Sequence, residues 1–309
     1  MRKTTLAALA ALTSLIVAPA AAQQPPAGPP VGPDWSKIEV KTTDLGNRTY
    51  MLEGQGGNVT VVVADDGVIM VDGQFAPMHE KLKAAIAALS PQPVRFLVNT
   101  HYHRDHVGGN VPFSKDGAVV VAHANVRNRL ASGGTMAIPD IKIPPAPAEA
   151  LPARTYTDAL TLELKGRTAQ LKHTAGAHTD GDTFVYIADA NVMSTGDTFT
   201  TGRYPNIDFV NGGSIDGMIG AFDAYLARAN DATKIVPGHG QVATKAQLAE
   251  FRAMLATARE RMTKLIAEGK SESDIYAAKP FADLDAKWAA NEQASRNFMR
   301  VVYSSMKKP

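Results

Sequence analysis

The six consecutive residues His101-Tyr102-His103-Arg104-Asp105-His106 constrain this 309-residue chain more than any other part of its sequence. They follow a short apolar run at 94–98 that is typical of a buried strand. Two histidines separated by one residue can turn both imidazoles toward one ion, while Asp105 and His106 can face a second ion. Four side chains of zinc-binding type within six residues therefore predict a metal site at this strand end.

The chain contains no cysteine. Disulfides, thiolate metal ligands and a cysteine nucleophile are therefore excluded, and any transition metal has to be held by histidine and carboxylate. Three later positions offer such side chains in glycine-rich turns beside β-type runs, namely His178, Asp197 and His239. Because turns at strand ends present side chains for binding, we expect these three to converge on the first cluster.

The amino end has the features of an export signal. A basic start at Arg2 and Lys3 precedes an apolar run at 6–17, and Ala20-Ala21-Ala22 offers small residues for cleavage. The run is too short to span a bilayer comfortably, and no stop-transfer pattern follows that would favour the alternative of a retained anchor. We predict a signal peptide over residues 1–22 and a periplasmic or secreted protein.

The charge balance bears on possible partners. Cleavage would remove two of the 32 basic residues and none of the 30 acidic ones, which leaves 30 of each and a net charge near zero. The mature chain therefore offers no electrostatic reason to bind nucleic acid or an anionic membrane. The expected partner is a small-molecule substrate, and the sequence does not indicate an oligomeric state.

The body of the chain alternates between strand-like and helix-like patterns. Residues 23–34 are rich in proline and predict an extended lead-in before it. Asp66-Gly67 between two apolar runs predicts a hairpin. The remaining periodicity predicts strands at 48–53, 58–64, 68–71, 94–98, 118–122, 160–164, 168–171, 183–188, 191–194 and 234–236, and helices at 78–90, 125–130 and 215–228. A pattern of strands, helix, strand and helix thus occurs twice, which favours an α/β fold of two sheets with helices outside.

Two further segments complete the organisation. Residues 138–152 are rich in proline and alanine and predict an irregular excursion, either over a site or, as we favour, as surface decoration. The tail is helical, with an apolar stripe from Leu248 to Leu265 and a capping-box pattern at Ser271 and Asp274. We predict a folded domain over 35–243 and C-terminal helices over 244–309 that pack on it.

The first cluster, its place after a buried strand and the order of the later ligand candidates resemble the metallo-β-lactamase superfamily over roughly residues 48–241. The resemblance implies a four-layer αβ/βα sandwich, here with a C-terminal helical extension. It also implies two zinc ions, which in family order would be held by His101, His103 and His178 at the first site, by Asp105, His106 and His239 at the second, and by Asp197 bridging both.

The resemblance implies a hydrolase. Two zinc ions lower the pKa of a shared water, so a metal-bound hydroxide is available near neutral pH, and Asp105 would orient it and take its proton. The expected substrate is a small ester, lactone, thioester or β-lactam. Three alternatives stay open: a β-lactamase proper, an iron-dependent sulfur dioxygenase, and a zinc-binding protein without catalysis.

The chain departs from the β-lactamase pattern beside the bridging position. Asp197 stands where one subclass has a cysteine, and Thr200 stands where those enzymes have a substrate-binding lysine and lactonase-like members often have a tyrosine. Arg203 or Tyr204 could take over the binding of substrate.

Several other polar residues have a structural interpretation beside a functional one. Asp72 is either a partner that supports the metal loop or a turn aspartate. We expect His123 and His173 to be structural residues or to lie around the metal ligands. We expect His79 to be on the solvent side of its helix, and Asp180 and Asp182 to fix the turn behind His178.

Overall fold

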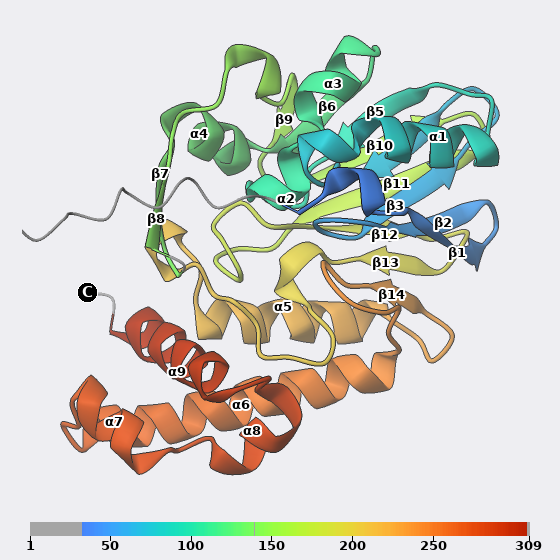
Figure 1. The fold of residues 1–309 in the computed structure, drawn as a ribbon. Coiled ribbons are helices and arrows are strands. Elements are labelled where there is room, and N and C mark those ends of the chain that lie inside the picture. Colours follow the sequence, from blue (N-terminus) through green and yellow to red (C-terminus); the bar gives the residue numbers. More distant parts are fainter. Residues whose placement is uncertain (1–32, 139, 308–309) are drawn as a thin grey trace, which may run out of the picture. The chain divides into compact units, whose positions relative to one another are not determined.

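The computed structural model describes residues 33–138 and 140–307. The predicted signal peptide and nearly all of the proline-rich lead-in lie outside the described residues, so both remain predictions. The chain divides into two compact units, Met1–Asp34 and Trp35–Pro309, and the second contains the fold described here (Figure 1).

A seven-stranded mixed sheet forms the first half of this unit. The strands lie in the order β1 (Lys41–Gly46), β2 (Thr49–Glu53), β3 (Val59–Val63), β4 (Val68–Val71), β5 (Val94–Val98), β6 (Val119–His123) and β9 (Arg154–Tyr156). The first four pair antiparallel, and β4, β5, β6 and β9 pair parallel. The hairpin predicted at Asp66-Gly67 is confirmed by the β3–β4 pairing.

A five-stranded sheet forms the second half. Its order is β10 (Ala159–Leu164), β11 (Arg167–His173), β12 (Thr183–Ile187), β13 (Val192–Ser194) and β14 (Lys234–Val236). Only β13 and β14 pair parallel, because the helix α5 (Ile215–Arg228) connects them.

The two sheets pack face to face with helices on both outer faces. On β3 and β4, Val62 and Ile69 point into the core between the sheets, whereas Val61 and Met70 point outward to α1 (His79–Leu89) and α3 (Asn110–Lys115). Strands buried on both faces read as continuous apolar runs, which is the pattern of these segments. Figure 1 shows α5 and α6 (Lys245–Ala267) covering the other side, so the predicted four-layer sandwich is confirmed.

Four helices follow the sandwich, as predicted for the C-terminal extension. They are α6, α7 (Glu272–Ala278), α8 (Ala282–Trp288) and α9 (Glu292–Met306). The capping box at Ser271 and Asp274 is confirmed, and a second one at Thr244 and Gln247 starts α6. Buried aromatic side chains join these helices to α5 in one core, with Phe251 stacked on Phe222. None of the described helices has both the length and the apolarity required to cross a membrane.

The remaining elements are short and connect the strands and helices described above. The short helices are α2 (Arg104–Val107) and α4 (Ala124–Ser132), with 3-10 turns at Trp35–Lys37 (η1), Ala76–Met78 (η2), Ala148–Ala150 (η3), Gly196–Thr198 (η4) and Phe209–Asn211 (η5).

Two expectations from the sequence are wrong here. The start of the excursion predicted as irregular forms part of a hairpin, β7 (Gly134–Ala137) with β8 (Asp140–Ile143), whose pairing supplies a regularity that the proline- and alanine-rich composition conceals. His79 is not on the solvent side: its ring is only 12 % exposed, packs edge-on against Phe113 and lies 3.0 Å from Asp116.

The start of α5 provides a test of the packing. An added Cβ at Gly217 would lie 1.9 Å from the carbonyl oxygen of Gly176, whereas a Cβ at Gly220 on the same helix meets nothing within 4 Å. We expect Gly217→Ala to lower the free energy of unfolding by about 1–3 kcal/mol because backbone has to move. Gly220→Ala should raise it by about 0.5–1 kcal/mol through helix propensity. Urea denaturation of both variants measures this, and equal effects would contradict the packing described.

Candidate metal centre

The sheet topology brings the ligand candidates to one edge. Parallel strands end at the same edge of a sheet. Asp72 follows β4 and the His101–His106 cluster follows the parallel strand β5, while Asp197 and His239 follow the parallel pair β13 and β14. The two halves are joined at this edge by Asn58, whose backbone N–H donates to the Gly238 carbonyl at 2.7 Å and whose side chain donates to the Gly240 carbonyl at 2.8 Å.

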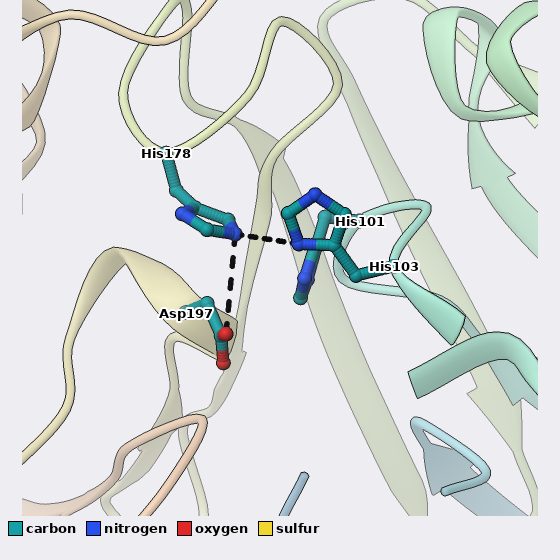
Figure 2. Close-up of side chains that lie close together, drawn as sticks. All are labelled: His101, His103, His178 and Asp197. Atoms are coloured by element: carbon teal, nitrogen blue, oxygen red, sulfur yellow. Dashed lines mark hydrogen bonds and ion pairs between the residues drawn. The ribbon is translucent and has the colours of Figure 1, made fainter. Parts of the chain in front are cut away.

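All seven predicted ligand side chains lie together. They form two groups in which the candidate ligand atoms lie within 4.8 Å of one another: His101, His103, His178 and Asp197, and Asp105, His106 and His239. Figure 2 shows the first group, with the His178 ring turned toward both His103 and Asp197.

Asp197 lies between the two groups. Its Oδ2 is 3.9 Å from His178 Nε2 in the first group, and its Oδ1 is 3.1 Å from His106 Nε2 and 3.4 Å from His239 Nε2 in the second. One carboxylate thus faces both sets of nitrogens, which is the placement a bridging ligand requires.

Four histidines are each anchored from outside the cluster through one ring nitrogen. His106 Nδ1 donates to Asp72 at 2.8 Å, His103 Nε2 to Asp208 at 3.1 Å, and His178 Nδ1 to the Asn206 carbonyl at 2.7 Å. His101 Nδ1 lies 3.0 Å from the hydroxyl of Thr100, whose own proton goes to Asp72. Because carboxylate and carbonyl oxygens only accept hydrogen bonds, a proton lies on each outer nitrogen. The inner nitrogens of His101, His103 and His178 carry lone pairs when those rings are neutral. Burial opposes protonation of His106, but Asp197, Asp105 and Asp72 outweigh it and raise the pKa of His106 well above its usual value.

The inward-pointing atoms lack protein partners suited to them. His103 Nδ1 and His178 Nε2 face one another at 2.9 Å, and both carry lone pairs when their outer nitrogens hold the protons. His101 Nε2 is buried without a hydrogen-bond partner, while His106 Nε2 and Asp197 Oδ1 face one another at 3.1 Å. Unpartnered buried acceptors are costly and rare in folded proteins, and a cation satisfies all of them at once. The residues present therefore fit a metal ion.

Two histidines of the first group are held neutral by their surroundings. Burial, with a smaller effect of the neighbouring histidines, holds the pKa of His101 well below its usual value. Burial and the nearby His103 lower the pKa of His178 to about 4. Neutral imidazoles are the form that binds metal, so these two require no deprotonation near pH 7.

The second group is more strongly charged. Burial opposes ionisation of Asp105, but His106 and His239 outweigh it and lower its pKa to about 2. Burial likewise opposes protonation of His239, but Asp197 and Asp105 raise its pKa to about 9. In the metal-free protein these carboxylates therefore hold a proton on His239 at neutral pH.

Two glycines allow the ligands to approach the backbone closely. A Cβ at Gly57, in the loop between β2 and β3, would lie 2.1 Å from the His106 ring, and one at Gly238 would lie 2.0 Å from Asp197 Oδ1. No pattern in the sequence indicates that Gly57 contacts the His106 loop about fifty residues away.

Two aspartates hold ligand histidines through hydrogen bonds, and only one of them was predicted from the sequence. Asp72 supports the metal loop, because it accepts hydrogen bonds from the Thr100 N–H at 2.8 Å and from His106. Asp208 was not identified from the sequence, although it binds both the Tyr102 hydroxyl and His103. Nothing near position 208 in the sequence distinguishes it from an ordinary loop aspartate.

The turn behind His178 is held differently from expectation in one respect. Asp182 accepts from the Thr179 N–H at 2.8 Å and fixes the turn, whereas the Asp180 carboxylate pairs with Arg129 at 2.7 Å and ties the turn to α4. The rings of His123 and His173 stack at 3.7 Å outside the ligand groups.

A cavity of about 740 Å³ opens beside the cluster, and Asp105, Asp197 and His239 line it. Both proposed substrate-binding residues also line it, but Tyr204 donates its hydroxyl to Asp285 at 2.9 Å and stacks on Phe298. Thr200 is buried together with its hydroxyl oxygen. Of these three side chains, only that of Arg203 is exposed toward a ligand.

Comparison with known proteins places this site in a family context. Residues 52–239, more than half of the chain, match the family model described as the metallo-beta-lactamase superfamily. Among solved structures, a metallo-beta-lactamase from Pontibacter korlensis superimposes with a TM-score of 0.59 and 18% identity, covering 71% of this chain and 99% of that one. The DIM-1 metallo-beta-lactamase gives a TM-score of 0.57 with 16% identity over 72% of this chain and 100% of that one. At sequence identities this low, the structural similarity shows only that the fold is shared.

Curated relatives are more diverse. Hydroxyacylglutathione hydrolase from Polaromonas sp. is 26% identical over 54% of this chain and 56% of its own. The 2,4-dinitroanisole O-demethylase subunit alpha of Nocardioides sp. is 27% identical over 58% of this chain and 52% of its own. The linear primary-alkylsulfatase of Pseudomonas sp. is 23% identical over 59% of this chain and 41% of its own. The chain thus spans about half the length of the curated relatives it matches.

The anchoring of His103 can be tested at Asp208. Asp208→Ala removes the acceptor for His103 Nε2, so we expect zinc affinity to fall about 10–100-fold, with a smaller loss for Asp208→Asn. Competition with a chromogenic chelator measures the affinity. Asp223→Asn on α5, which breaks an exposed pair with Arg252 on α6, is the matched control. Unchanged affinity in a folded Asp208→Ala protein would contradict the anchoring role.

Metal binding should release protons. Because the pKa of His239 in the metal-free protein is about 9, zinc has to displace its proton below that pH. Apparent affinity should therefore rise by about tenfold per pH unit for this proton from pH 7 and level off above pH 9. Calorimetric titration in two buffers of different ionisation enthalpy counts the protons, and His239→Gln should release one fewer. A count of zero at pH 7.5 would overturn the charge assignment.

Proposed function

Since the chain belongs to the metallo-β-lactamase superfamily, we propose that it is a zinc-dependent hydrolase with two metal ions, acting on a small ester, lactone, thioester or β-lactam. The observation that carries the proposal is the set of inward-facing nitrogens and carboxylate oxygens, which together could hold metal ions. The division into two groups with Asp197 between them favours two ions rather than one.

The ligands divide as the family order implies. His101, His103 and His178 would hold the first ion, Asp105, His106 and His239 the second, with Asp197 shared. Zinc bound there supplies a lowered pKa for coordinated water and polarisation of the scissile bond.

The chain's own residues supply the remaining requirements. Asp105 lines the cavity and is ionised at neutral pH, so its carboxylate can accept a proton from the attacking water. In the metal-free protein His239 Nε2 lies 3.2 Å from Asp105 Oδ2, so both side chains face the position of the second ion. Asp72 and Asp208 hold the imidazoles of His106 and His103 in place. The side of Asp105 that faces the cavity is therefore where substrate and water meet.

The names of two relatives support hydrolysis: one is a hydroxyacylglutathione hydrolase and one a linear primary-alkylsulfatase. A β-lactamase activity is less favoured, because the buried Thr200 cannot act as the lysine at that position does in those enzymes. Activity in the periplasm or outside the cell is proposed from the amino-terminal pattern alone.

The test is a panel of chromogenic ester, lactone, thioester, β-lactam, phosphodiester and sulfate ester substrates on zinc-loaded protein. We expect turnover of at least one carbonyl substrate and a loss of about 10²–10⁴-fold in kcat for Asp105→Asn, since a positioned general base contributes that much. His103→Ala should be inactive, so activity that persists there identifies a contaminant.

Metal analysis separates the alternatives. Two zinc ions per chain are expected. One iron per chain with no hydrolysis of any substrate would overturn the hydrolase in favour of a redox enzyme. If Asp105→Asn kept its zinc and changed no turnover, the protein would be a zinc-binding protein without catalysis.

A further inference from the structure

The cavity beside the ligand cluster is walled by three segments that are far apart in the sequence. They are the β7–β8 hairpin, the loop 200–206 that follows Asp197, and the helices α8 and α9. The family match ends at His239, so the α8–α9 wall comes from residues beyond it. The volume of about 740 Å³ is that of a site for a small organic molecule.

Two of these walls are apolar. Met136, Ile138 and Ile141 come from the hairpin and the turn that joins its strands, and Trp288, Phe298 and Val301 come from α8 and α9. Ile141 is 37% exposed, which makes it one of three exposed large apolar side chains in the described residues, with Val119 and Val210. An exposed apolar surface that continues into a concave site indicates an apolar ligand group.

The same cavity carries two cationic side chains. Arg104 and Arg203 both line it and are exposed, and neither forms an ion pair within the described parts of the chain. A guanidinium presents a planar set of donors that suits a carboxylate or another oxyanion. Unpaired arginines beside an apolar wall therefore match a ligand with both an anionic and an apolar part.

We propose that the substrate is an amphiphilic anion, an ester that carries an extended apolar group and a separate anionic group. The apolar group packs on the wall of the hairpin and α8–α9, and the anionic group pairs with Arg203. This inference rests on the proposed hydrolase function. In the reaction the oxygen of water bonds to the carbonyl carbon, the ester carbon–oxygen bond breaks, and the leaving oxygen takes the proton.

The test uses aryl esters with acyl chains of graded length, each made with an uncharged end and with a terminal carboxylate. We expect kcat/KM to rise with chain length, by at most about fourfold per methylene. We also expect the carboxylate form to be preferred, and Arg203→Gln to lower this preference about tenfold, as the loss of one charge-assisted hydrogen bond predicts. Arg154→Gln, an exposed arginine on β9 outside the cavity, is the matched control.

Variants of the apolar wall test whether it binds the apolar group of the substrate. Met136→Ala with Ile141→Ala removes two partly exposed side chains and should flatten the dependence on chain length, whereas Val119→Ala removes an exposed apolar side chain outside the cavity and should not. A dependence on length that survives the double variant, or a preference for the carboxylate that survives Arg203→Gln, would overturn the inference.

A binding measurement keeps the two proposals distinct. Calorimetry with nonanoate and with nonanol, neither of which can be hydrolysed, measures the affinity of the cavity for each compound without turnover. Tighter binding of nonanoate that is lost in Arg203→Gln supports the inference even if no ester is cleaved, in which case the hydrolase proposal fails alone. Equal binding of the two compounds, with esters hydrolysed regardless of length and charge, would defeat the inference and leave the hydrolase intact.

Discussion

The outward hydrogen bonds of four histidines are the constraint on which the rest of the site depends. Each ring is held by an acceptor outside the cluster, so its remaining nitrogen points inward. The chain thereby places nitrogens and carboxylate oxygens face to face, as His103 and His178 show at 2.9 Å. Such an arrangement is unfavourable without a cation and becomes favourable with one, so metal binding and the stability of this edge are coupled.

The double sandwich makes that arrangement possible because it contributes ligands from both sheets. The first sheet provides the cluster after β5 and the second provides His178, Asp197 and His239. Asn58 joins the halves through hydrogen bonds to the loop that carries His239, and Gly57 leaves room for the His106 ring. Metal affinity therefore depends on residues that never touch the metal.

The ligand candidates and part of the proposed substrate wall come from different parts of the chain. The ligand candidates lie within residues 52–239, which match the superfamily, whereas half of the apolar wall comes from α8 and α9 beyond that match. The helical extension packs through Phe251 and Phe298 into the core of α5. One fold can serve many substrates when the residues that line the site differ while the ligands stay the same.

The sequence by itself determined the layers and the ligand residues. Period-two and period-3.6 patterns located the sheets and helices of the sandwich, and a dense polar run after a buried strand located the cluster, because these are local properties of the chain. Only the tertiary structure decided which distant groups support that cluster. Asp208 lies 105 residues from its partner His103, and Ile141 and Trp288 meet at one cavity from opposite ends of the fold. Such contacts depend on how loops and helices pack, and packing of distant segments leaves no period or spacing in the sequence to read.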